Sequence, residues 1–120
     1  MHRPFARFLW IVAAALALAG CGNPVPPDKI AYVGEWKSKD MWLTITRDGS
    51  VRYERRKDNA RTTVQAPLQA FEGDSFVVGI GPMKTKFVVS KPPYRDGAVW
   101  KMVVDGVELV RSEASEERQA

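Results

Sequence analysis

The sequence predicts an all-β domain: a small antiparallel up-and-down meander of seven to eight strands, closed into a barrel or a strongly curved sheet. Short runs of alternating apolar and polar residues recur about every ten residues, which is the pattern of a half-buried strand. Dipeptides that favour tight turns, such as Asp48-Gly49, separate these runs. No helical period appears after residue 30, so we expect hairpins to join consecutive strands.

The first 20 residues of the 120-residue chain differ from the rest. Residues 1–7 carry Arg3 and Arg7, and residues 8–19 form an unbroken apolar run. A helix of about a dozen residues is roughly 18 Å long, whereas a bilayer core of about 30 Å needs around 20 apolar residues. The run is too short to span a membrane stably but is typical of a secretory signal peptide. We therefore expect residues 1–20 to form a signal helix that is cleaved.

The only cysteine, Cys21, follows this segment directly. Its context, Leu18-Ala19-Gly20-Cys21, resembles the lipobox of bacterial lipoprotein precursors at every position. The resemblance implies cleavage between Gly20 and Cys21, a diacylglycerol thioether on Cys21 and an N-acyl chain on its new amino group. A thiolate is a good nucleophile near neutral pH, and two or more acyl chains anchor a protein stably.

The same resemblance implies that the protein lies in the cell envelope, where the acyl chains on Cys21 anchor it in membrane lipid. Aspartate after the cysteine resembles an inner-membrane retention signal in enterobacterial lipoproteins, and this chain has Gly22 there. The outer membrane, facing the periplasm, is therefore the favoured location. An acylated Cys21 would leave the mature domain without a disulfide.

The β-domain is expected to span residues 30–111. Before it, residues 21–29 combine the lipidated cysteine with a proline-rich tether. An extended polyproline conformation, at about 3.1 Å per residue, would hold the domain roughly 25 Å from the membrane. After it, residues 112–120 are predominantly polar and acidic and are expected to be a disordered tail.

Seven to eight strands are predicted within the domain, and the strand over residues 41–46 alternates, with Met41, Leu43 and Ile45 on one face. Pro67 indicates an edge or a bulge in the fourth strand, and residues 91–97 are expected to be a loop. The predicted strands are residues 30–37, 41–46, 50–56, 61–72, 75–80, 84–90, 98–104 and 107–111.

Aromatic residues are expected to fill most of the core, because a domain of about 80 residues is marginal without disulfides or metal ions. Each large ring buries about 150–250 Å². The aromatic residues in or beside the predicted strands are Tyr32, Trp36, Trp42, Tyr53, Phe71, Phe76, Phe87 and Trp100.

Gly34-Glu35-Trp36 in the first strand and Arg111 in the last resemble lipocalin-like barrels, which begin with Gly-x-Trp and place an arginine over the tryptophan ring. The resemblance implies a structural Trp36–Arg111 pair and carriage of a small apolar ligand. A stacked guanidinium contributes about 0.5–2 kcal/mol. Lipocalins are nearly twice as long, so another small barrel or a curved sheet filled by its own side chains is the alternative.

Basic residues cluster around one predicted hairpin tip, with Glu54 and Asp58 among them. Such clusters often bind nucleic acid, but an envelope location argues against that partner. An anionic lipid or an acidic envelope protein would suit the cluster; charges that protect a sheet edge are the alternative. No oligomeric state is predicted. The clustered residues are Arg52, Arg55, Arg56, Lys57 and Arg61.

We expect no catalytic activity and no metal or cofactor besides the acyl chains on Cys21. The only histidine, His2, lies in the signal segment, so the mature chain has no histidine base or ligand. The predicted function is a lipid-anchored binding or interaction module. The alternatives are a lipocalin-like carrier of a small apolar ligand and an inhibitor of a cell-wall hydrolase, a class that includes small lipidated β-barrels.

Overall fold

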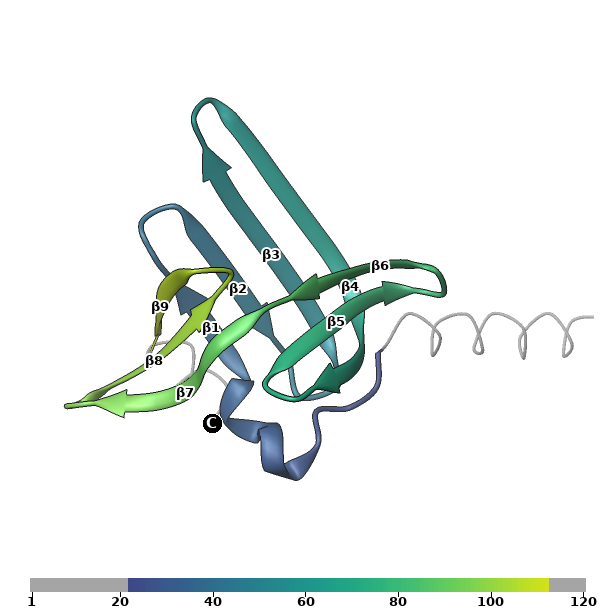
Figure 1. The fold of residues 1–120 in the computed structure, drawn as a ribbon, viewed down its shortest axis with the longest axis horizontal. Helices are drawn as coiled ribbons and strands as arrows, with labels where there is room; N and C mark the ends of the chain where they lie inside the picture. The colour runs from purple at the N-terminus through teal and green to yellow at the C-terminus, as the bar shows by residue number, and fades with distance from the viewer. Residues whose placement is uncertain (1–21, 113–120) are drawn as a thin grey trace, which may run out of the picture.

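The computed structural model describes residues 22–112. These residues form one antiparallel sheet with the strand order β6-β5-β4-β3-β2-β1-β9-β8-β7, which curls strongly into a half-barrel (Figure 1). Strands β1 to β6 pair consecutively as in a meander, and so do β7 to β9. Strands β6 and β7 do not pair with each other but form the two edges of the sheet, and β9 joins the two runs by pairing with β1. The all-β, up-and-down prediction is confirmed. The strands are β1 (Gly34–Lys37), β2 (Met41–Ile45), β3 (Ser50–Lys57), β4 (Ala60–Glu72), β5 (Ser75–Ile80), β6 (Met83–Phe87), β7 (Val89–Asp96), β8 (Val99–Val104) and β9 (Val107–Arg111).

The described chain has one strand more than the upper bound of the prediction, because residues 91–97 do not form a loop. Residues 91–96 contribute most of β7, which pairs with β8 through Lys91↔Val103 and Tyr94↔Lys101, and Gly97 belongs to the turn between the two strands. Two prolines lie between these paired positions, where the register shifts. Proline cannot donate a ladder hydrogen bond, but β7 lies at the edge of the sheet, where this loss is tolerated.

Pro67 marks an irregularity, as expected. The ladder between β3 and β4 ends at Ser50↔Pro67, and the register between β4 and β5 shifts between Leu68 and Ala70. This bulge turns the long strand β4 from one part of the sheet into the next, because bulges bend a strand and increase its twist.

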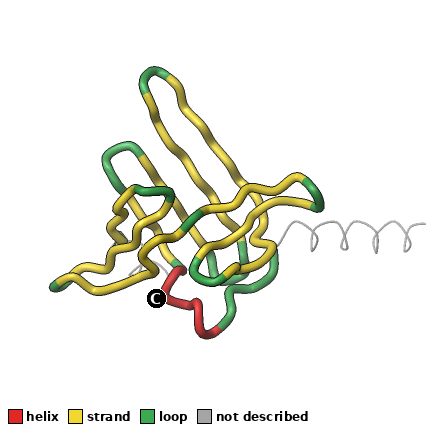
Figure 2. Tube along the Cα trace, in the orientation of Figure 1, coloured by secondary structure: helices red, strands yellow, loops and turns green. Residues whose placement is uncertain are grey.

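The strand predicted over residues 30–37 begins later, at Gly34. A short 3-10 helix, η1 (Pro27–Tyr32), precedes it and covers one end of the sheet (Figure 2, red). Pro27 at the first helical position explains part of this difference, since its fixed φ suits a helical turn and it has no N–H to leave unbonded. The buried Tyr32 side chain holds the helix against the core.

Residues 22–29 do not form a free-standing spacer. The N–H of Asn23 donates to the carbonyl of Leu68, and the N–H of Val25 donates to the carbonyl of Arg47, each at 3.0 Å. The Val25 side chain is only 6% exposed. Hydrogen bonds and burial thus hold this segment on the domain, whereas an extended polyproline chain would leave its backbone in water.

The inner face of the half-barrel is filled by side chains of the chain itself. Strand β2 alternates as predicted, with Met41, Leu43 and Ile45 each at most 1% exposed. Trp42 lies on the opposite, outer face and is half-buried, so it does not belong to the predicted aromatic core. The largest fully buried side chains are Trp36, Phe76, Phe87, Met41, Leu43, Ile45, Met102, Leu109, Val51, Val78 and Val104.

Within residues 22–112, no helix combines the length and the apolar character needed to cross a membrane.

Candidate functional site: a cationic cleft at one end of the half-barrel

The predicted basic cluster lies on the hairpin of β3 and β4, and the sheet divides it between two faces. Alternate residues of a strand point to opposite faces. Arg55 and Lys57 therefore share the inner face with Tyr53, whereas Arg52 and Arg56 point outward. Arg61 pairs directly with Arg56 across the hairpin and lies on the outer face as well.

On the outer face, two of the cations contact neighbouring side chains. Arg61 forms an ion pair with Glu54. The guanidinium of Arg56 lies 6.0 Å from the centre of the Trp42 ring, within range of a cation–π contact. These contacts fit the alternative in which charges protect an exposed hairpin.

The inner-face cations belong to a cleft of about 510 Å³, here called the mouth cleft. It lies between the turn that joins β1 and β2, the end of β3, and the start of β9. Its lining consists of residues 38–41, residues 55–58 and Val107.

Positive charge predominates around the mouth cleft. Lys39 adds to the inner-face cations Arg55 and Lys57, against the two carboxylates of Asp40 and Asp58. Arg56 also borders the cleft, but its guanidinium lies near Trp42 on the outer face. Val107 supplies apolar surface to the same cleft, whereas Met41, which also borders it, is only 1% exposed. A partner with acidic groups and some apolar surface would match this lining.

Backbone hydrogen bonds hold the walls of the cleft in position. The N–H of Arg56 donates to the carbonyl of Asp40 at 2.8 Å, and the N–H of Ser38 donates to the carbonyl of Met41 at 2.8 Å. At the hairpin tip, Asp58 takes a left-handed conformation with φ of 57°. Aspartate tolerates this conformation better than most residues, and Asn59 completes the two-residue turn.

The cleft and the N-terminal segment lie at opposite ends of β3. Gly49, directly before β3, contacts the backbone of Asn23, whereas Lys57 at the other end of the strand lines the cleft. Eight residues at about 3.3 Å each make this strand roughly 25 Å long. The hairpin of β3 and β4 accordingly points away from the start of the described chain (Figure 1).

The expected contact between Trp36 and Arg111 is present. The two residues are directly paired between β1 and β9, and the guanidinium carbon lies 5.9 Å from the Trp36 ring centre. The same guanidinium lies 5.1 Å from the Trp100 ring, and Arg95 lies 5.9 Å from that ring. Two tryptophans and two arginines thus alternate across β1, β9, β8 and β7.

Sequence reasoning missed the two partners Trp100 and Arg95. The turn at Asp105-Gly106 was the available signal, because it sets the register of β8 and β9 and so brings Trp100 level with Arg111. The buried indole N–H of Trp36 donates to the carbonyl of Tyr32 at 2.9 Å. This row of residues therefore has a structural role in joining four strands and η1.

The groups with shifted pKa values lie outside the mouth cleft. Burial, reinforced by the Asp74 charge, raises the pKa of Tyr32 to about 12. A hydrogen bond from Lys101 lowers the pKa of Asp96 and raises that of Lys101 itself. In the part of the chain that the structure describes, no three histidine, cysteine, aspartate or glutamate side chains gather in a way that could hold a metal ion.

Cys21 and Gly20, the predicted lipidation and cleavage positions, lie outside the described residues. Comparison of the chain with protein-family models, with curated proteins and with solved structures gives no match.

Proposed function

We propose that this protein is a lipoprotein of the cell envelope, anchored through acyl chains on Cys21, whose β-domain is a non-catalytic binding module for an acidic partner. The anchoring part rests on the lipobox residues Leu18 to Cys21. The binding part rests on one observation, the excess of cations around the mouth cleft.

The position of the cleft favours a protein partner over lipid of the anchoring membrane. Gly22 follows the proposed anchor directly, and its segment lies at the opposite end of β3 from the cleft. With Cys21 in the membrane, the cleft would lie roughly 25 Å away from the residues next to the anchor. An acidic segment of another envelope protein could reach it there.

Acylation of Cys21 can be tested in cells with a clickable fatty acid. The full-length protein is expected to incorporate the label, and Cys21→Ala is expected to abolish labelling and to accumulate uncleaved precursor. Lys57→Glu is the matched control, because a change in the cleft should leave acylation intact. Labelling that persists in Cys21→Ala would refute the lipobox interpretation.

Binding at the cleft can be tested by photo-crosslinking in intact cells. A photoreactive residue at Lys57 is expected to give a discrete protein adduct, and one at Thr63, on the outer face of the same hairpin, is expected to give none. Arg55→Glu on the inner face should remove the adduct, whereas Arg52→Glu on the outer face makes the same charge change and should retain it. An adduct equally sensitive to both variants would argue against the cleft.

A carrier of a small apolar ligand is the second candidate. The apolar side chain of Val107 beside a cleft of about 510 Å³ favours it, and the filled interior leaves the mouth as the place for a ligand. Native mass spectrometry of the purified full-length protein would show a co-purifying small molecule for a carrier. Loss of cell-wall hydrolase activity on addition of the protein would instead support the inhibitor.

A further inference from the structure

We propose that the tip of the β5–β6 hairpin is a second membrane contact, which inserts Ile80 and Met83 into the surface of the bilayer that holds Cys21. This proposal rests on the proposed acylation of Cys21. It assigns the domain an orientation on the membrane: the β5–β6 tip faces the lipid and the mouth cleft faces away from it.

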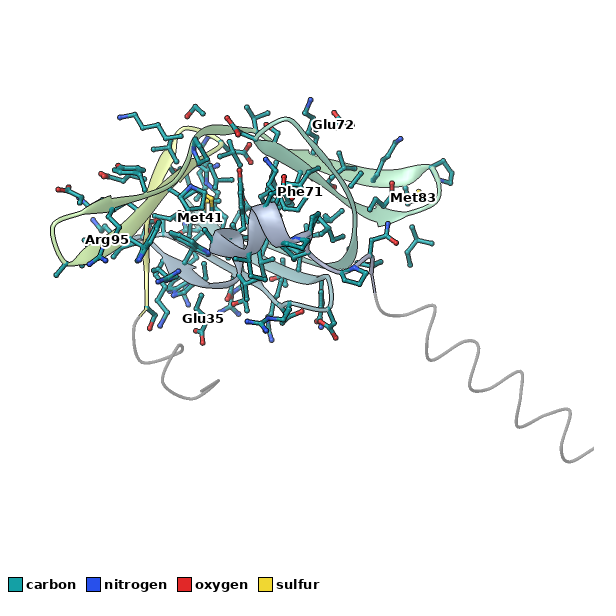
Figure 3. The ribbon with its side chains drawn as sticks, turned by 90° about the horizontal axis from the view of Figure 1, so that it is seen from below. Glu35, Met41, Phe71, Glu72, Met83 and Arg95 are labelled. Atoms are coloured by element: carbon teal, nitrogen blue, oxygen red, sulfur yellow. The ribbon has the colours of Figure 1, made fainter. Side chains whose placement is uncertain are left out.

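The tip carries the two most exposed large apolar side chains among residues 22–112. Ile80 is 70% exposed and Met83 is 79% exposed, and the two are paired across the turn formed by Gly81 and Pro82. Figure 3 shows Met83 at one end of the molecule, far from Arg95 at the other. Two exposed apolar side chains on a projecting tip suit insertion between lipid headgroups.

Their placement follows from the pattern of the core. Phe76 and Val78 in β5 are fully buried, and Phe87 in β6 is 2% exposed. Ile80 and Met83 continue these two inner-face rows past the end of the core. The alternation thus continues to the tip of the hairpin, where no other part of the described chain covers the two apolar side chains.

The start of the described chain lies beside this hairpin. Gly22 shares a shallow groove with Gly79, Ile80 and Gly81. Side-chain hydrogen bonds connect the two parts. The side-chain amide of Asn23 donates to the backbone carbonyl of Gln69 at 2.6 Å, and the side-chain amide of Gln69 donates to the backbone carbonyl of Gly81 at 3.2 Å.

Docking of the N-terminal segment removes the spacer that would separate the domain from the lipid. Asn23 is hydrogen-bonded to β4, so only Gly22 lies between an acylated Cys21 and the first residue bonded to the sheet. A residue spans at most about 3.6 Å. The β5–β6 tip, which borders the groove at Gly22, would therefore lie close to the headgroups.

Charge near the tip matches a bilayer with anionic lipids. Lys84 follows Met83 and is exposed, and it forms no ion pair with the described residues. Arg47 is exposed as well, and it lies beside the N-terminal segment, because its carbonyl receives the Val25 N–H. Lysine and arginine side chains beside an apolar tip place their charges at headgroup phosphates while their stems cover apolar surface.

The test uses the full-length acylated protein in vesicles of phosphatidylethanolamine and phosphatidylglycerol. Because Cys21 is the only cysteine and would be acylated, a cysteine introduced at Met83 carries a single environment-sensitive fluorophore. Thr63→Cys, on the hairpin that points away, is the matched control. We expect a blue-shifted emission at position 83 and quenching by spin-labelled lipid several-fold stronger than at position 63.

Three outcomes would overturn the proposal or its premise. Equal and weak quenching at both positions in an acylated protein would exclude the hairpin contact while leaving the anchor intact. A blue shift at position 83 that grows with the protein-to-lipid ratio and resists lipid quenching would indicate contact with a second copy instead. Absence of acyl label on the protein would remove the lipid anchor itself.

Discussion

Replacing Trp36 by alanine tests whether the row of tryptophans and arginines stabilises the half-barrel. Trp36 is 0% exposed, and a buried aromatic residue of this kind removes about 150–250 Å² from water. At about 25 cal/mol per Å², the ring contributes at most about 4–6 kcal/mol, because the unfolded chain already buries part of that area. Measured losses for tryptophan-to-alanine changes in cores are about 3–5 kcal/mol, which is the loss expected here.

Two further effects act in the same direction. The Tyr32 carbonyl loses the indole N–H at 2.9 Å, and an unsatisfied buried acceptor costs about 1–3 kcal/mol. Arg111 loses one of the two rings that its guanidinium contacts. A domain of this size is stable by about 5–13 kcal/mol in total, so Trp36→Ala is expected to remove a large fraction of its stability.

Urea unfolding of the full-length protein in detergent micelles, followed by circular dichroism, measures this loss. Trp42→Ala is the matched control, because Trp42 is half-buried on the outer face and lies near Arg56 at 6.0 Å; it should cost about 1 kcal/mol or less. Trp36→Phe keeps an aromatic ring but removes the donor, and should fall between the two. A loss below about 1 kcal/mol for Trp36→Ala would refute a core role.

Two more predictions concern the end of the domain at which the chain begins. The pKa of Tyr32 is raised from 10.0 to about 12, so the folded state holds this proton more tightly, and stability is lost as the pH rises from about 10 to 12. Tyr32→Phe should start about 1 kcal/mol less stable, from loss of its bond to the Asp74 carbonyl, yet its urea midpoint should fall less over that pH range; parallel curves would contradict this. Gly49→Ala should destabilise the domain by more than about 2 kcal/mol and expose residues 22–26 to protease, because φ is +91° and a Cβ would lie 2.1 Å from the Asn23 carbonyl oxygen. Gly73→Ala, with φ of +62° and nothing within 4 Å of its Cβ, should cost about 1 kcal/mol, and equal losses for the two variants would argue against docking of the N-terminal segment.

Local patterns were sufficient for the predictions that the structure confirms. Alternation in β2 put Met41, Leu43 and Ile45 on the inner face, because successive side chains of a strand point to opposite sides whatever the rest of the fold. The contact of Trp36 with Arg111 was also predicted, through a family resemblance and not from pairing.

The predictions that were wrong depended on partners distant in the sequence. Residues 22–29 have the composition of a spacer, but the Val25 side chain is buried in the domain and its N–H donates to the Arg47 carbonyl. The two prolines at positions 92–93 indicated a loop, yet they lie on an edge strand, where the register with β8 shifts between Lys91 and Tyr94 and the missing N–H groups are tolerated.

The candidate site shows the same division. Composition predicted a basic hairpin tip, but the alternation of β3 sends Arg55 and Lys57 inward and Arg52 outward. A functional difference between these faces arises only because the β1–β2 turn and Val107 meet the inner one.

The sequence by itself determined an all-β meander, most of its turns and most of its inner-face residues, because each depends on the chemistry of neighbouring residues. The lipobox at Cys21 comes from the same kind of local pattern and stays a prediction. Only the tertiary structure decided that the N-terminal segment docks beside the β5–β6 tip, at the opposite end of β3 from the mouth cleft. The curling of the sheet brings residues distant in sequence into contact, and burial and backbone hydrogen bonding between them select one arrangement.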